Sequence, residues 1–176
     1  YVYDQYAEWW LNSLIGTGGW KDINIYPDYI SIQNEPDWGT QDQECRFDPT
    51  ENSSYAGYDK AFEAVYNKIN GNVSPMPKML APESVGFGSS QAFINALVNR
   101  GQINHIYGFS HHLYGDGSYG NPDGMIWGMT NYHNYYGYKP LFQTEYDSLE
   151  DPPTFAQAVL QAQHIHNCLV YEGATS

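Results

Sequence analysis

Two glutamates stand at the ends of short segments that favour β-strands, and their carboxyl groups are the strongest candidates for chemistry in this chain. Glu35 follows residues 29–34 and precedes Pro36, and Glu145 follows residues 141–144. In a parallel α/β sheet the carboxyl ends of the strands share one edge, so both side chains would project from it. A pair of carboxyl groups across a bound sugar is the minimum requirement of a glycosidase, because one protonates the leaving oxygen while the other attacks the sugar or activates water.

Two adjacent histidines at the end of a further expected strand, over residues 106–113, indicate hydrogen bonding and not metal binding. His111 and His112 are followed closely by Tyr114. Because neighbouring residues of a strand point to opposite faces, the two histidines would not bind one metal ion together, and we predict no metal site. One histidine, together with Tyr114, is expected to donate hydrogen bonds to a substrate or to a catalytic carboxylate. The other is expected to be a core residue, which suits His111 better than His112.

Other chemistries lack their sequence signatures. The chain has no glycine-rich dinucleotide motif, no phosphate-binding loop, no Gly-x-Ser-x-Gly elbow and no paired cysteine motif, so we expect no cofactor. Cys45 and Cys168 are too few for a disulfide framework or a zinc site, and the sequence leaves open whether they are free thiols or a pair.

The composition favours a neutral, hydroxyl-rich partner. A formal net charge of −13 would repel nucleic acid and anionic membranes, and no apolar run approaches the length of about 18 residues that spans a bilayer. Aromatic residues make up 16% of the chain, with 17 Tyr and 5 Trp. Aromatic rings stack on the C–H faces of sugars, so this content suits a polysaccharide, although most of the tyrosines are expected to fill the edges of the core.

The segments that would position these groups alternate between strand and helix patterns. The expected strands cover residues 29–33, 79–81, 106–113 and 141–144. The expected helices cover residues 1–15, from Ser53 or Ser54 to Gly71, from Ser89 or Ser90 to Gly101, 125–136, and from Thr154 through Val170. A long loop is expected from Asp37 to Asn52. The apolar positions of the last helix are Phe155, Val159, Leu160, Ile165, Leu169 and Val170.

This alternation predicts one α/β domain over residues 1–176 with a parallel sheet. No hairpin turn joins any two strands, and no linker interrupts the pattern. Alternation alone does not distinguish a doubly wound sheet from a (β/α)8 barrel.

Five segments of the chain resemble the xylanases of glycoside hydrolase family 30, which belong to the clan of retaining (β/α)8-barrel glycosidases. These segments are 31–37 (Ser-Ile-Gln-Asn-Glu-Pro-Asp), 80–84 (Leu-Ala-Pro-Glu-Ser), 112–115 (His-Leu-Tyr-Gly), 142–146 (Phe-Gln-Thr-Glu-Tyr) and 163–167 (Gln-His-Ile-His-Asn). They occur in the family's order and cover nearly the whole chain. The resemblance implies a partial (β/α)8 TIM barrel that runs from the third to the seventh helix and contains strands four to seven. We expect such an open part of a barrel not to fold stably alone, because it exposes strand edges.

The resemblance also implies roles for individual residues. Glu35 would be the general acid/base at the end of strand four, and Glu145 the nucleophile at the end of strand seven. Asn34 would hold the 2-hydroxyl of the sugar in the −1 subsite. The remaining substrate-binding residues would be Trp38, His112, Tyr114 and Tyr146. Glu83 lies in a matching segment, but the resemblance gives it no definite role.

The activity implied by the resemblance is that of a secreted, monomeric endo-β-1,4-xylanase that hydrolyses xylan or glucuronoxylan by double displacement. Glu145 would attack the anomeric carbon while Glu35 protonates the glycosidic oxygen, and Glu35 would then activate water. Alternatives within the family are a β-1,6-glucanase and a glucosylceramidase-like β-glycosidase. The alternative from another class is a non-catalytic carbohydrate-binding barrel, which would keep the aromatic residues but lose a carboxylate.

Overall fold

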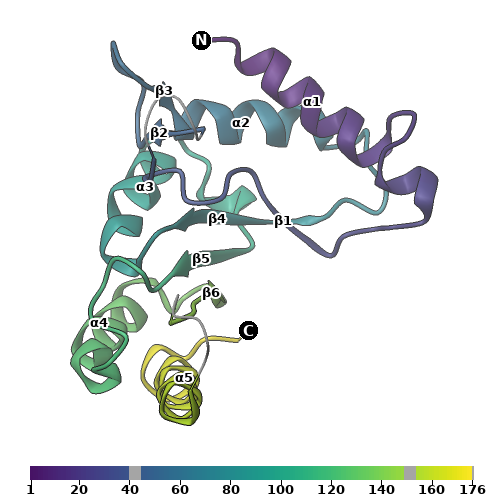
Figure 1. The fold of residues 1–176 in the computed structure, drawn as a ribbon. Coiled ribbons are helices and arrows are strands. Elements are labelled where there is room, and N and C mark those ends of the chain that lie inside the picture. Colours follow the sequence, from purple (N-terminus) through teal and green to yellow (C-terminus); the bar gives the residue numbers. More distant parts are fainter. Residues whose placement is uncertain (40–44, 149–153, 176) are drawn as a thin grey trace.

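Four parallel strands form the main sheet of the computed structural model, which describes residues 1–39, 45–148 and 154–175. The strands are β1 (Tyr29–Ser31), β4 (Lys78–Ser84), β5 (Gly108–His112) and β6 (Leu141–Glu145), and they lie side by side in that order. Each neighbouring pair is parallel. The sheet is curled like half of a barrel and is flanked by helices (Figure 1). The predicted α/β class with a parallel sheet is therefore confirmed.

Helices connect the successive strands of the main sheet, as the alternating pattern predicts. The α-helices of the described residues are α1 (Tyr3–Ile15), α2 (Tyr58–Ile69), α3 (Phe87–Asn99), α4 (Ile126–Tyr136) and α5 (Phe155–Asn167). Shorter helical turns are η1 (Trp20–Ile23), η2 (Ile103–His105), η3 (Pro122–Met125) and the π-helical turn η4 (Cys168–Glu172). Within the described ranges, no helix has both the length and the apolar character needed to cross a membrane.

The main hydrophobic core lies between the sheet and helices α2 and α3. Phe62, Ile94 and Phe109 represent these three elements, and none of them is more than 1% exposed. Helix α1 confirms the helix expected over residues 1–15, and it packs on α2 and adds Ala7 and Leu14 to the same core. This packing fixes the strands that carry the candidate catalytic residues.

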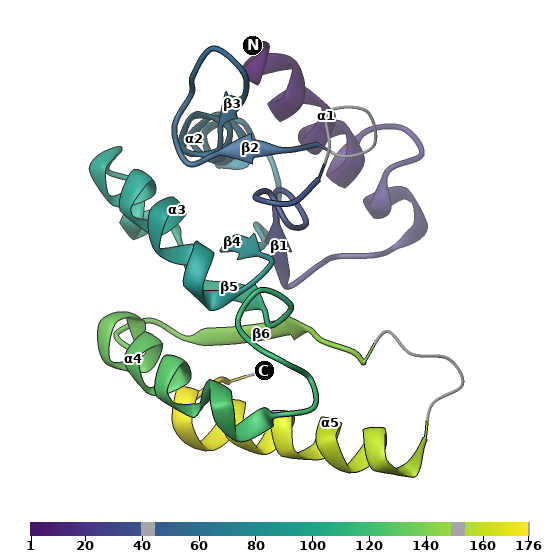
Figure 2. The same cartoon turned by 60° about the vertical axis from the view of Figure 1, so that its left-hand side comes forward.

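A second, smaller core supports the far end of the sheet. It is formed by Leu113, Met125, Met129 and Cys168. Figure 2 shows α4 and α5 side by side next to β6, and η4 contacts both helices. Cys168 is buried in this core and Cys45 is exposed, and both are free thiols.

The predicted start of the second helix is wrong. Helix α2 begins at Tyr58 and not at Ser53 or Ser54, because the preceding residues form a small parallel pair of strands, β2 (Phe47–Asp48) and β3 (Ala56–Gly57). The Asn52 side chain accepts hydrogen bonds from the backbone of Ser54 and Tyr55 and so forms a turn between these strands. The predicted loop from Asp37 to Asn52 therefore contains β2, and its residues 40–44 lie outside the described part of the chain.

The predicted start of the third helix is also wrong. Helix α3 begins at Phe87, upstream of Ser89 and Ser90. The Asp116 carboxylate accepts hydrogen bonds from the backbone amides of Phe87 at 2.6 Å and Gly88 at 2.8 Å. These bonds satisfy two free amides at the helix N-terminus, so a residue distant in sequence takes the capping role that a local serine was expected to fill.

The last helix confirms its predicted cap but not the direction of its apolar side chains. The Thr154 hydroxyl accepts a hydrogen bond from the Gln157 backbone, and the helix becomes π-helical after Asn167, so it does not continue regularly to Val170. Its buried residues are polar, because His164 and Asn167 bond to the backbone before and within η3. The expected apolar positions mostly face away from the protein, with exposed fractions of 87% for Phe155, 44% for Val159, 51% for Ile165, 56% for Leu169 and 57% for Val170.

Candidate active site

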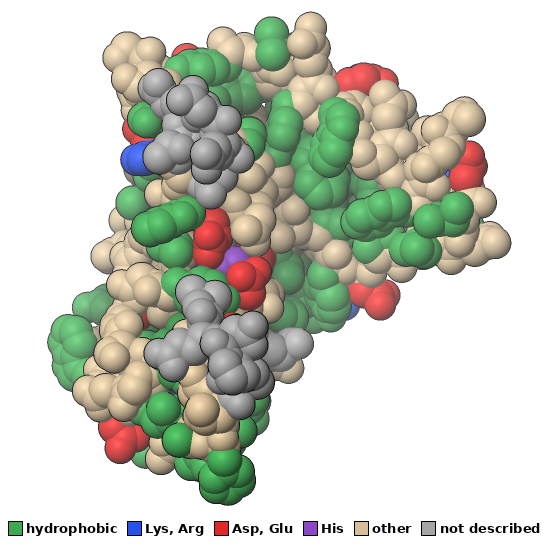
Figure 3. Space-filling view, in the orientation of Figure 1, with side chains coloured by type: hydrophobic (Ala, Val, Ile, Leu, Met, Phe, Trp, Pro, Cys, Tyr) green, Lys and Arg blue, Asp and Glu red, His purple; other side chains and the backbone are tan. Residues whose placement is uncertain are grey.

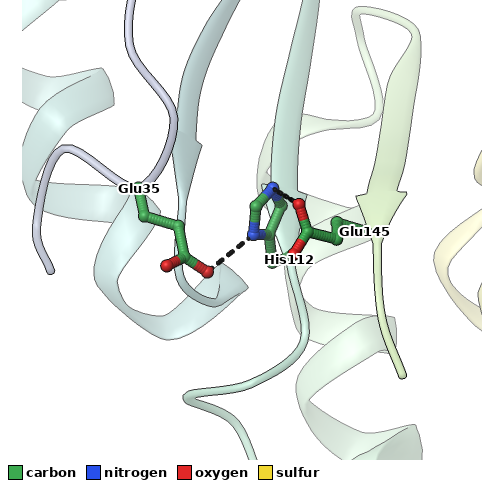
Figure 4. A group of neighbouring side chains, drawn as sticks. All are labelled: Glu35, His112 and Glu145. Carbon is green, nitrogen blue, oxygen red and sulfur yellow. Dashed lines mark hydrogen bonds and ion pairs between the residues drawn. The ribbon is translucent and has the colours of Figure 1, made fainter. Parts of the chain in front are cut away.

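The imidazole of His112 lies between the two candidate catalytic carboxylates. Its Nδ1 is 2.8 Å from Oε1 of Glu35, and its Nε2 is 3.8 Å from Oε2 of Glu145. Figure 4 shows the three side chains converging from the carboxyl ends of neighbouring parts of the sheet. The His112 side chain is 1% exposed, whereas those of Glu35 and Glu145 are 18% and 52% exposed. The structure thus brings together three of the residues singled out from the sequence.

The two carboxylates line one cavity of about 440 Å³. Trp38 and Tyr114 provide aromatic walls, and Val85 and Gly115 complete the lining. The volume is typical of pockets for small ligands, which commonly measure about 300–1,000 Å³. In Figure 3, acidic side chains flank a histidine near the middle of this face, with hydrophobic side chains close by. A cavity with aromatic walls and two carboxylates is suited to a polar ring such as a sugar.

A third carboxylate, that of Glu83, faces Nε2 of His112, the same ring nitrogen that faces Glu145. Glu83 Oε1 is 3.4 Å from His112 Nε2, and its carboxylate also accepts a hydrogen bond from the Thr144 hydroxyl. Strand β4 reaches Ser84, past the end predicted at Ala81, and this extension places Glu83 within the sheet. Glu83 is 6% exposed and does not line the cavity between Glu35 and Glu145.

The contacts between these groups shift the pKa values of His112 and Glu83 in opposite directions, and each shift favours the charged form. Burial alone lowers the pKa of His112, but hydrogen bonds to Glu83 and Glu35 and the charge of Glu145 raise it above its usual value. Burial alone raises the pKa of Glu83, and its hydrogen bonds to His112 and Thr144 lower it below its usual range. The two shifts favour a protonated imidazole facing an ionised Glu83.

Tyr114 is placed to fix the orientation of Glu145. Its hydroxyl donates a hydrogen bond to Glu145 Oε1 at 3.3 Å. Burial and the negative charge of Glu145 raise the pKa of Tyr114 to about 12, so the hydroxyl keeps its proton throughout the neutral range. The Tyr146 ring packs against the Tyr114 ring with centroids 5.4 Å apart, and it supports that ring from outside the cavity.

Asn34 does not line the cavity of the two carboxylates. Asn34 lines a separate hollow of about 420 Å³, together with Trp9, Trp10 and Cys45. The structure therefore brings Glu35, Trp38, Tyr114 and Glu145 together around one cavity and sets Asn34 beside it.

His111 faces the opposite side of the sheet from His112, as the strand geometry predicts. Its Nδ1 donates to the backbone carbonyl of His112 at 2.6 Å, and its Nε2 lies 2.7 Å from Oε1 of Glu172. The side chains of His111 and Glu172 are both fully buried. Glu172 ends η4 and His111 lies in β5, so the pair ties η4 to the end of β5 and with it to the backbone of His112.

The described part of the chain has one group of side chains that could hold a metal ion, formed by Glu35, His112 and Glu145. One ligand atom from each of them lies within 4.8 Å of the other two. Acidic groups commonly gather in this way without a metal, and the aromatic cavity beside them favours an organic ligand. No protein-family model matches the chain, and no curated protein matches its sequence significantly.

Two residues around the site were not assigned roles from the sequence. Glu83 follows the strand expected over residues 79–81 and lies in one of the segments that resemble the family, so the sequence indicated a position near the site. Glu172 had none, because it follows an apolar helical pattern and its partner His111 is distant in sequence.

Proposed function

We propose that this chain is the catalytic part of a retaining endo-β-1,4-xylanase built on a (β/α)8 barrel. The observation that carries the proposal is the proximity of the two strand-end carboxylates, because one carboxylate oxygen of Glu35 and one of Glu145 lie within 4.8 Å of each other. Retaining glycosidases separate their carboxyl groups by about 5–5.5 Å, whereas inverting enzymes need roughly 6.5–9.5 Å to admit water between them. The short separation supports direct attack by one carboxylate on the sugar.

The two carboxylates differ in the ways that their proposed roles require. Glu145 is the more exposed and receives hydrogen bonding from Tyr114, which suits an ionised nucleophile that reaches the anomeric carbon. Glu35 is less exposed and lies beside His112, which suits a group that transfers a proton. In the first step Glu145 attacks and Glu35 protonates the departing oxygen. In the second step Glu35 takes a proton from water, which releases the sugar from Glu145.

The substrate class is inferred from the walls of the cavity and from the sequence. Trp38 is 58% exposed at the cavity and offers an open ring face to a sugar. The net charge of −13 disfavours anionic polymers such as nucleic acid and leaves a largely neutral polysaccharide as the best partner. The choice of xylan rests on the resemblance of the strand-end segments to family 30 xylanases. Because xylan is a polymer outside the cell, we propose that the enzyme is secreted. We also propose that it acts as a monomer.

The barrel itself is supported by the curvature of the sheet and by one additional contact. Ala174 forms a parallel bridge with Leu141, on the side of β6 opposite to β5. A strand following α5 would therefore add to the sheet in the same parallel sense, as it does in a (β/α)8 barrel.

The proposal is tested with the full-length protein that contains this chain, as wild type and as Glu145→Gln, by measuring reducing-sugar release from linear xylan, glucuronoxylan and β-1,6-glucan. The variants in the later tests are made in the same full-length protein. We expect both xylans to be hydrolysed and Glu145→Gln to reduce kcat by at least about 10³-fold, because the nucleophile is lost. Circular dichroism provides the control that the variant is folded. Hydrolysis of the glucan alone would overturn the choice of xylan. Sugar binding without hydrolysis, unchanged by the substitution, would instead identify a carbohydrate-binding protein.

A further inference from the structure

Glu83 is an extra residue that bulges out of strand β4. Pro82 pairs with Ser110 of β5, and Ser84 pairs with the very next residue, His111, so Glu83 has no partner in the ladder. Its φ of 66° lies in the left-handed region, which is uncommon for a residue with a side chain. Bulges are a known means of redirecting one side chain next to an active site.

A matching irregularity lies on the other side of β5. His111 pairs with Gln143 and His112 pairs with Glu145, so Thr144 of β6 is also skipped. The two skipped residues meet, because the Thr144 hydroxyl donates a hydrogen bond to the Glu83 carboxylate. The two bulges therefore place an anchored carboxylate against Nε2 of His112, which projects between them from β5.

The groups that face His112 come from all the strands around it. Glu35 follows β1, Glu83 belongs to β4, Glu145 ends β6, and the Tyr114 ring meets the imidazole edge-on with centroids 5.9 Å apart. Nδ1 has the Glu35 carboxyl as its partner at 2.8 Å, while Nε2 is nearest to Glu83 at 3.4 Å. An imidazole between carboxylates on both sides satisfies both contacts only when each ring nitrogen carries a proton.

We propose that Glu83 is a positioning residue that holds His112 with a proton on each ring nitrogen, so that Nδ1–H fixes Oε1 of Glu35. This inference rests on the proposed function, because it gives Glu35 the role of acid/base. With Oε1 held by His112, the other carboxyl oxygen of Glu35 exchanges the proton with the glycosidic oxygen and later with water. The imidazolium stabilises the Glu35 carboxylate that is left when the proton departs, and the Glu83 charge balances the imidazolium.

Glu83 fulfils this role without touching substrate. It is 6% exposed and does not line the cavity shared by Glu35 and Glu145, so its effect on the reaction passes through His112. A simple structural role for Glu83 would require its shape and hydrogen bonds but not its charge. Glu83→Gln separates the two, because it keeps the shape and one acceptor oxygen and removes the charge.

The experiment is an NMR titration of the ¹⁵N-labelled histidine side chains in the wild type and Glu83→Gln, with the His112 signal assigned through His112→Gln. An opposite charge within about 4–6 Å shifts a pKa by roughly 1–3 units. We expect Glu83→Gln to lower the pKa of His112 by about one unit or more. The control is Asp147→Asn, which removes an exposed carboxylate near the site and should leave His112 within about 0.3 unit of the wild type. An unchanged titration of His112 in folded Glu83→Gln would overturn the proposal.

The pH profile of xylan hydrolysis provides the second readout. We expect Glu83→Gln to lower kcat by about tenfold or more and to move the alkaline limb of kcat/KM toward lower pH. Glu83→Asp retains the charge but moves it away from Nε2, so it should lower the pKa of His112 less than Glu83→Gln does and still measurably below the wild type. If Glu83→Gln does not fold, an unchanged titration of His112 in Glu83→Asp overturns the proposal. The titration needs no substrate. Failure of xylan hydrolysis in the wild type would therefore count against the proposed function, whereas an unmoved His112 would count against the role of Glu83.

Discussion

The backbone amide of Glu35 donates a hydrogen bond to the backbone carbonyl of Glu83 across 2.9 Å, and both residues have a positive φ, 43° for Glu35 and 66° for Glu83. This bond ties the chain beyond β1 to the bulge in β4. Left-handed backbone at residues with side chains is uncommon and persists where the surrounding structure holds it, often at functional sites. The orientation of the proposed acid/base therefore depends on β4 as well as on its own strand.

The proposed role of Glu35 as the acid predicts that the fall in rate caused by Glu35→Gln depends on the leaving group of the substrate. Glu35→Gln should lower kcat on xylan by about 10²–10⁴-fold, because the departing sugar needs a proton. In aryl xylosides of acidic phenols, the phenolate leaves without being protonated. Glu35→Gln should therefore slow the first step of the reaction far less on these substrates. Burst-phase kinetics with such substrates measure this step directly. An equal loss on xylan and on the activated aryl xyloside would contradict the assignment of Glu35 as the acid.

The hydrogen bond from Tyr114 to Glu145 predicts a specific effect of Tyr114→Phe. This change keeps the aromatic wall and removes the hydroxyl that fixes the carboxylate. A hydrogen bond to a charged group contributes about 1.5–3 kcal/mol, so we expect kcat to fall by about 10–100-fold while KM changes little. Steady-state kinetics on linear xylan measure both values, and a rise in KM with unchanged kcat would assign Tyr114 to binding alone.

The exposed ring of Trp38 predicts a loss of substrate binding. Trp38→Ala should raise KM for xylan by about tenfold through the loss of stacking, with a smaller effect on kcat. Trp127 is a matched control, because it is 80% exposed on α4 and does not line the cavity. Trp127→Ala should leave both constants unchanged. If the two variants behaved alike, Trp38 would not form part of the sugar-binding wall.

The buried pair of His111 and Glu172 predicts how stability depends on pH. Burial alone lowers the pKa of His111, but the charge of Glu172 and hydrogen bonds to Glu172 and to the backbone of His112 raise it above its usual value of 6.5. Because this pKa is raised by folding, its stabilising contribution is complete below pH 6.5 and is lost as the pH rises through the folded value. The free energy of unfolding should therefore decline on the alkaline side of pH about 6.5.

Glu172→Gln tests this explanation through urea unfolding at several pH values. Removing one partner of a buried ion pair costs about 3–5 kcal/mol, and the decline on the alkaline side should become less steep. Some of the decline should remain, because folding also raises the pKa of His112. An identical pH dependence in the variant and the wild type would contradict the assigned role of Glu172.

Local sequence patterns predicted the elements whose signals lie within a few residues. The strands before Glu35 and Glu145 are indicated by their strand-forming residues, and the opposite faces of His111 and His112 follow from the alternation of side chains along a strand. The cap at Thr154 depends on Gln157, which is three residues away. These features depend on backbone geometry that a short segment determines by itself.

The remaining features depend on partners that are distant in sequence. Asp116 caps α3 from 29 residues away, and this contact explains why the helix begins before Ser89. The bulge at Glu83 appears only in the register between β4 and β5. Phe155 is 87% exposed because polar residues of α5 make the contacts to the rest of the protein. Tertiary contacts of this kind leave no periodic signal in the sequence.

The central claim is that Glu35 and Glu145 hydrolyse xylan by double displacement, and the stereochemistry of the first product tests it most directly. We would follow the hydrolysis of linear xylo-oligosaccharides by ¹H NMR from the first minutes, before the released sugars mutarotate. The carboxylate separation predicts that the new reducing end appears first as the β-anomer, with the α-anomer growing only later. Initial release of the α-anomer, or the absence of any hydrolysis by the folded wild type, would contradict it.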